Sequence, residues 1–142
     1  MASQTPDYAL LDHTADLAVR VRGNDPKSLF ENAGKALMHL MLRGKAAVSP
    51  KGFRISLSGR DLADLLVRWL GELLYLLQGE NLVVIGLSVA HLSSDRLEAV
   101  VQTVPFDPEV HEILREIKAV TYHQVEAAEK GDHWEAKVIL DI

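Results

Sequence analysis

Residues 61–77 decide the fold class, and they have the sequence DLADLLVRWLGELLYLL. Their leucine and tryptophan side chains recur at intervals of three and four residues, which places them on one wide stripe of an α-helix. Asp64, Arg68 and Glu72 fall on the opposite side of that helix. The glycine in QGEN, residues 78–81, suits the end of a helix. The stretch therefore predicts a long amphipathic helix with one face buried.

An earlier segment has the same helical spacing. Asp25 is a suitable N-cap, Pro26 suits the first helical position, and Gly44 supplies a stop. The apolar residues between them form one stripe, and they are Leu29, Phe30, Ala33, Ala36, Leu37, Leu40 and Met41. The sequence predicts a second amphipathic helix here, followed by a loop at residues 45–52.

Most of the remaining chain alternates between apolar and polar residues, which predicts β-strands. The expected strands are residues 8–11, 17–21, 53–57, 82–92, 97–104, 117–127 and 134–140. Polar turns at residues 93–96 and around Gly131 join the last four strands into two hairpins. Residues 105–112 break the pattern with a short polar segment.

Two helices cannot cover both faces of so many strands. We therefore predict an α+β, two-layer sandwich in which a mostly antiparallel sheet of six to seven strands carries two main helices on one face. The length of 142 residues predicts a single domain, residues 1–142. Residues 1–7 are expected to form a loosely ordered N-terminal extension.

The composition excludes several functional classes. A net charge of −5 argues against a protein that grips nucleic acid over a broad basic face. The absence of cysteine excludes disulfides, thiolate catalysis and cysteine-based zinc sites. The chain starts without a secretory leader and has no apolar stretch long enough to span a bilayer, so we expect a cytoplasmic protein without membrane contact. Its glycines occur singly, so no phosphate-cradling loop is present.

Several oxygen-bearing groups could meet at one end of the predicted sheet. Asp141 and the α-carboxylate of Ile142 follow directly after the last strand, and Asp16 closes the polar segment HTAD, residues 13–16. If Asp16 meets the other two, the group repels itself unless a cation or a lysine neutralises it. The alternatives are that Asp16 satisfies backbone amides in a turn and that Asp141 is a solvated residue near a chain end.

Lys118 is the basic residue that could serve such a cluster. A lysine on a strand is usually an exposed edge charge. Lys118, however, begins a run rich in β-branched and aromatic residues, so it could neutralise the carboxylates or hold a phosphate. His13 and His123 border the polar segments and could orient the aspartates, although a purely structural hydrogen bond is the more common role for each.

These same residues resemble the archease family. The resemblance is carried by HTAD at residues 13–16, WLGELLYL at 69–76, EIKAVTYH at 116–123 and the final Asp141-Ile142, in the order and spacing of that family. It covers the chain from Tyr8 onward. Departures from the family pattern are Ala18, Gly71 and the pair Thr103-Val104.

The resemblance implies a non-catalytic helper of the RtcB-type RNA ligase in tRNA splicing and RNA repair. Such a protein promotes guanylylation of the ligase and multiple turnover, and any contact with GTP or tRNA is made through the ligase. By the resemblance, the ligands of a divalent metal ion, calcium or alternatively magnesium or manganese, would be Asp16, Asp141 and Ile142. Lys118 matches a functional lysine of the family.

Two other functions stay open on the sequence. An independent metal-dependent phosphoester hydrolase could use the same carboxylates, and it predicts turnover by the isolated protein. A chaperone-like binding module could use an exposed surface of the leucine-rich helix, and it predicts client binding that a chelator does not affect.

Overall fold

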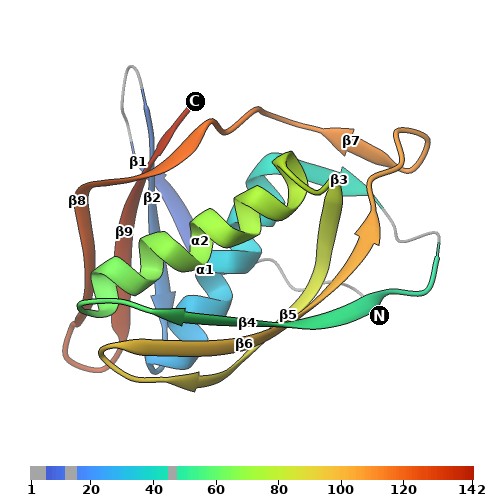
Figure 1. Ribbon diagram of the computed structural model, residues 1–142. Coiled ribbons are helices and arrows are strands. Elements are labelled where there is room, and N and C mark those ends of the chain that lie inside the picture. Colours follow the sequence, from blue (N-terminus) through green and yellow to red (C-terminus); the bar gives the residue numbers. More distant parts are fainter. Residues whose placement is uncertain (1–5, 12–15, 45–47) are drawn as a thin grey trace.

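The computed structural model describes residues 6–11, 16–44 and 48–142 (Figure 1). Residues 1–5 of the predicted N-terminal extension and residues 45–47 of the predicted loop lie outside the described residues. The two helices within them are α1, Pro26–Met41, and α2, Leu62–Gln78. The strands in the same ranges are β1 Tyr8–Leu11, β2 Asp16–Gly23, β3 Leu42–Gly44, β4 Lys51–Ser58, β5 Leu82–Leu92, β6 Arg96–Pro105, β7 His111–Ile113, β8 Ala119–Glu129 and β9 Trp134–Asp141.

The strands form three antiparallel sheets. Their orders are β1-β2-β9-β8, β4-β6-β5 and β3-β7. Helix α1 contacts β2 and β5, and α2 contacts β8, β5 and β4, so both helices lie against one face of the four-stranded sheet and are covered by the three-stranded sheet (Figure 1). The predicted class, α+β with two helices and antiparallel strands, is confirmed.

The strands are more numerous than the six to seven expected, and they do not form a single sheet. β3 and β7 are the two strands beyond the seven expected ranges, because each has three residues and is too short to show an alternating pattern. Gly44 ends β3 rather than α1, and its φ of +139° disfavours any residue with a side chain. An added Cβ there would also collide with the carbonyl oxygen of Val110, so this pairing requires glycine.

Local capping explains where the helices begin. The Asp25 carboxylate accepts a hydrogen bond from the Ser28 amide at 2.8 Å, and the Ser28 hydroxyl oxygen accepts one from the Asp25 amide at 3.1 Å. This reciprocal arrangement satisfies two amides at the start of α1. Asp61 is the N-cap of α2, where its carboxylate accepts from the Asp64 amide at 2.8 Å. The N-cap predicted at Asp25 is confirmed.

The core lies between the helices and the sheets. Trp69 at the centre of α2 is fully buried, and its indole N–H donates to the carbonyl of Phe30 in α1 at 2.9 Å. The helix-facing side of the four-stranded sheet is apolar and carries Val19, Val21, Val138 and Leu140, all buried. Within the described residues, no helix combines the length and apolar character needed to cross a bilayer.

The opposite side of the four-stranded sheet is polar, because side chains alternate between the two faces of a strand. We call this side, turned away from the helices, the outer face. Its polar members on the two central strands are Asp16, Arg20 and Arg22 of β2 and Glu135, Lys137 and Asp141 of β9.

Candidate functional site

Asp16 and Asp141 face each other across the two central strands. Asp16 is the first residue of β2 and Asp141 the last residue of β9, and the antiparallel register pairs them directly. Directly opposed residues have Cβ atoms about 4.5–5.5 Å apart and point to the same side of the sheet. Asp16 is half-buried and Asp141 is exposed. The structure therefore brings together the two carboxylates that the sequence analysis singled out.

Strand β8 holds Asp141 from its other side. Ala119 is the register partner of Asp141, and the Lys118 amide donates to the Asp141 carbonyl at 2.7 Å. The Thr121 hydroxyl donates to the Ile139 carbonyl at 2.8 Å. The chain therefore stays paired up to Asp141, rather than fraying. Lys118 lies at the same end of the sheet with an exposed side chain, and Ile142 follows Asp141 directly.

The donor chemistry of this end fits an oxygen-preferring divalent ion. Two carboxylates directly opposite each other repel, and calcium is bound mainly by carboxylate and main-chain oxygens. The described residues contain no group of three or more His, Cys, Asp or Glu side chains placed to hold a metal. His13, Thr14 and Ala15 lie outside those residues. The assignment of Asp16, Asp141 and Ile142 as metal ligands stays a prediction.

Asp64 is a buried acidic residue that the sequence pattern did not identify. The helical pattern placed it on the polar side of α2, yet it is 2% exposed. Its carboxylate accepts hydrogen bonds from the Tyr122 hydroxyl at 2.7 Å, the Arg60 amide at 2.9 Å and Nε of Arg68 at 3.1 Å. The Tyr122 hydroxyl and then the Arg60 amide hold the pKa of the Asp64 carboxyl well below its usual range.

The bond between Asp64 and Tyr122 ties α2 to an irregular part of β8. The register of β8 against β9 shifts between Thr121 and Glu126, and Gln124 in that interval has a φ of +53°. Tyr122 lies one residue after Thr121, whose hydroxyl bonds β9. Asp64 therefore anchors the strand that flanks Asp141, which is a structural role. No pattern in the sequence indicated this role, because Tyr122 lies 58 residues away in the chain.

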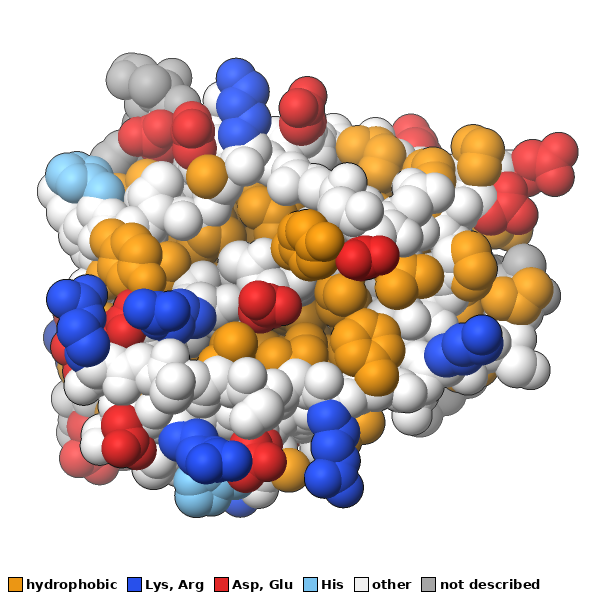
Figure 2. Space-filling view, viewed as in Figure 1, with side chains coloured by type: hydrophobic (Ala, Val, Ile, Leu, Met, Phe, Trp, Pro, Cys, Tyr) orange, Lys and Arg blue, Asp and Glu red, His pale blue; other side chains and the backbone are white. Residues whose placement is uncertain are grey.

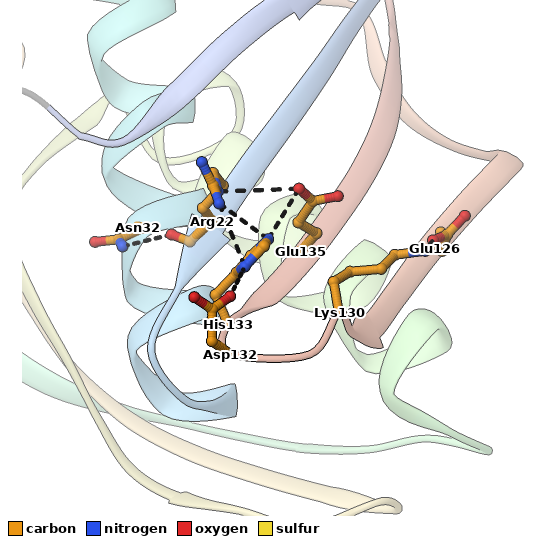
Figure 3. A network of polar contacts seen from close by, with 7 residues as sticks. All are labelled: Arg22, Asn32, Glu126, Lys130, Asp132, His133 and Glu135. Carbon is orange, nitrogen blue, oxygen red and sulfur yellow. Dashed lines mark hydrogen bonds and ion pairs between the residues drawn. The ribbon is translucent and has the colours of Figure 1, made fainter.

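A second polar network occupies the far end of the outer face (Figure 3). The ring of His133 lies between two carboxylates, with Nδ1 at 2.8 Å from Asp132 Oδ1 and Nε2 at 3.0 Å from Glu135 Oε1. Nη2 of Arg22 lies 3.2 Å from Nε2 of the same ring. Asp132 and then Glu135 raise the pKa of His133, while His133 lowers the pKa of both carboxyls. The arrangement favours a doubly protonated imidazolium.

This network predicts a pH dependence of folding stability. Because the folded protein raises the pKa of His133, its contribution is fully present below the ordinary value of 6.5 and is lost as pH rises through the folded pKa. The variant His133→Gln should therefore lose stability relative to the wild type at pH 6 and approach it at pH 9. Urea unfolding at both pH values measures this. His91→Gln, at an exposed histidine on β5, is the control, and an equal pH response in both variants would contradict the prediction.

The other histidines do not join the aspartate pair. His123 is exposed, and His13 lies outside the described residues. His111 was expected in a polar segment but is 4% exposed in β7, where its Nδ1 accepts from the Asp107 amide at 3.0 Å. Its burial follows from the pairing of β7 with β3, which the sequence pattern did not predict.

One face of the molecule exposes apolar side chains. Figure 2 shows them gathered across the middle of the face, over α2 and the strands beside it. Tyr75 of α2 and Tyr122 of β8 are 52% and 49% exposed. The alternative function of a binding module would use such a surface, and these two aromatic side chains are its largest members on α2 and β8.

Comparison with known proteins gives consistent matches over nearly the whole chain. The sequence model of the Archease protein family matches residues 8–142. Protein archease of Methanosarcina acetivorans is 36% identical over 146 residues, and that of Methanosarcina barkeri is 34% identical over 153; both alignments cover all of both chains.

Solved structures share the fold. The solution structure of protein 1598 from Methanobacterium thermoautotrophicum is 27% identical, with a TM-score of 0.72 and coverage of 96% of this chain and 99% of that one. The crystal structure of a Thermotoga maritima protein, described as an archease and possible chaperone, is 20% identical with a TM-score of 0.61. It covers 93% of this chain and 94% of its own, and at that identity it is similar in fold alone.

Proposed function

The chain belongs to the archease family, and we propose that it acts as a non-catalytic activator of an RtcB-type RNA ligase in tRNA splicing and RNA repair. It would promote guanylylation of the ligase and so allow multiple turnover. The observation that carries the proposal is the direct register opposition of Asp16 and Asp141, with Lys118 at the same end of the sheet.

In the proposed mechanism, carboxylate oxygens of Asp16 and Asp141 hold a divalent ion, together with a main-chain or terminal oxygen of Ile142. Calcium suits this oxygen donor set, and magnesium or manganese are the alternatives. Such an ion supplies positive charge that offsets the charge developing on phosphate oxygens during nucleotidyl transfer.

The chain's own residues keep this end in place and orient it. Pairing of Asp141 with both β2 and β8 fixes the direction in which its carboxylate points. Lys118 is exposed, so its ammonium group is free to contact a phosphate of GTP that the ligase holds. Contact with tRNA would likewise be made through the ligase.

The proposal is tested by multiple-turnover RNA ligation with a matching ligase, GTP and limiting amounts of ligase. We expect Asp16→Asn, Asp141→Asn and Lys118→Gln each to reduce stimulation by about tenfold or more, the loss expected for a charged contact worth about 1.4 kcal/mol or more. Asp7→Asn is the matched control, because Asp7 is exposed and its carbonyl accepts from the Arg22 amide at the other end of the sheet. Circular dichroism of each variant confirms that it is folded.

The same set of variants separates the rival functions. Full stimulation by all three variants would remove the proposal. Hydrolysis of a phosphoester by the isolated protein with magnesium or manganese, lost in Asp141→Asn, would favour the hydrolase. Suppression of client aggregation that persists in a chelator and in Asp16→Asn, but is lost in Tyr75→Ser, would favour a binding module that uses the apolar surface of α2.

A further inference from the structure

Two cations face each other on the outer face. Arg20 of β2 and Lys137 of β9 are register partners, so their side chains leave the sheet on the same side. Like charges directly opposite each other destabilise a sheet. Lys137 donates to the amide oxygen of Gln124 at 3.0 Å, which is a neutral partner. This pair is therefore a concentration of positive charge in a chain whose net charge is −5.

A polar hollow of about 240 Å³ adjoins the pair. Besides Arg20 and Lys137, its charged lining consists of Lys130, Glu126 and Glu135. Figure 3 shows Glu126 turned toward Lys130, and Glu135 turned toward the ring of His133. The two carboxylates are thus occupied: Glu126 pairs with Lys130 at 2.7 Å, and Glu135 lies 3.0 Å from His133 Nε2. Glu126 is also the register partner of Lys137. The three cations and two carboxylates of the lining therefore leave one net positive charge for a ligand.

We propose that this hollow binds a phosphomonoester dianion. A phosphate group carries a charge of about −1.5 to −2 at pH 7, which matches two cations. Guanidinium and ammonium groups are the side chains that bind phosphate oxygens most strongly. The hollow is many times larger than the space of about 10–15 Å³ that one water molecule needs, so it has room for a phosphate group and for part of the group that the phosphate esterifies.

The hollow is distinct from the aspartate pair, although it lies on the same face. Arg20 follows Asp16 by four residues along β2, and Lys137 precedes Asp141 by four along β9. Four residues of strand span about 13 Å, and the buried pair Ala18 and Ile139 lies between the two places. The inference therefore does not depend on a metal ion or on the ligase.

The test is a titration of the protein with inorganic phosphate, adenosine 5′-monophosphate and adenosine at low ionic strength, followed by amide chemical shifts and calorimetry. We expect saturable binding of phosphate and monophosphate, with shifts centred on β2 and β9, and no binding of adenosine. Arg20→Gln and Lys137→Gln should each weaken the binding about tenfold, equal to about 1.4 kcal/mol. Added salt should weaken it further, because the site is open to solvent.

Two further variants make the test specific. Arg54→Gln removes the same charge from an exposed position on β4 and should leave the affinity unchanged. Glu126→Gln removes the partner of Lys130 and should tighten the binding, because it frees a third cation. The proposal is overturned if phosphate does not bind saturably or if adenosine binds as tightly as adenosine 5′-monophosphate. It is also overturned if Arg54→Gln loses as much phosphate affinity as Arg20→Gln does. Weaker binding in Glu126→Gln would also contradict it.

Discussion

Replacing Trp69 with alanine is expected to destabilise the protein by about 3–5 kcal/mol, the range found when large buried aromatic side chains are truncated. Trp69 is fully buried at the centre of α2, and its indole N–H reaches across to the Phe30 carbonyl of α1. The loss removes apolar contacts, leaves a cavity between the helices and breaks a buried hydrogen bond. Because domains of this kind are stable by about 5–15 kcal/mol, one substitution could remove much of the total.

Trp69→Phe provides the graded comparison, because it keeps most of the ring volume and loses the hydrogen bond. It should cost about 1–3 kcal/mol, the effect of leaving a buried polar group without its partner. Trp134→Ala, at a half-buried position of β9, should cost less than Trp69→Ala. Urea unfolding followed by circular dichroism measures all three. A cost below 1 kcal/mol for Trp69→Ala would show that the helices do not pack through this residue.

The parts of the fold that the sequence predicted are those fixed by neighbouring residues. The stripe around Trp69 and the Asp25 cap lie within single helices, and the tight turns at residues 93–95 and 130–133 join strands that are adjacent in the chain. Periodicity and capping are local properties, so they can be seen without knowing the tertiary structure. The α+β class follows from them.

The parts that the sequence did not predict depend on residues far apart in the chain. Asp64 is buried and accepts a hydrogen bond from Tyr122 of β8, and the helical pattern of α2 cannot indicate a contact with that strand. The pairing of β3 with β7 joins Leu42 to Ile113, and neither strand is long enough to be recognised alone. Burial of a polar side chain and pairing of short strands are tertiary properties, and they overrode the local patterns.

In the candidate site, too, local features could be predicted from the sequence and long-range contacts could not. The sequence indicated that Asp16 and Asp141 lie at strand ends, but their closeness depended on the register of β2 against β9. Register also pairs Arg20 with Lys137 and brings Arg22 to the carboxylate of Glu135 at 3.9 Å. Those residues are spread over more than a hundred positions of the chain. The sequence showed only charged residues alternating along each strand, and this pattern does not distinguish a binding site from an ordinary solvated face of a sheet.

Replacing Asp141 with asparagine is expected to have opposite effects with and without calcium. In a chelator, the variant should be as stable as the wild type or more stable by about 0.2–1 kcal/mol, because the repulsion between directly opposed carboxylates is gone. In calcium, the wild type should gain stability, by about 2.7 kcal/mol when the free ion is at a hundred times its dissociation constant. The variant should gain little, since one of the two opposed carboxylates no longer carries charge. Urea unfolding in chelator and in calcium measures both effects.

The reversal of sign distinguishes an ion site from a structural contact. If Asp141 mainly accepted hydrogen bonds, its replacement would lower stability in both solutions. If calcium bound elsewhere, the variant would gain as much stability as the wild type does. Asp7→Asn removes the same charge from an exposed position near Arg22, so it should respond to calcium as the wild type does. Asp16→Asn should behave like Asp141→Asn, because each carboxylate is the register partner of the other. A calcium response that survives in either aspartate variant would remove the ion from this end of the sheet.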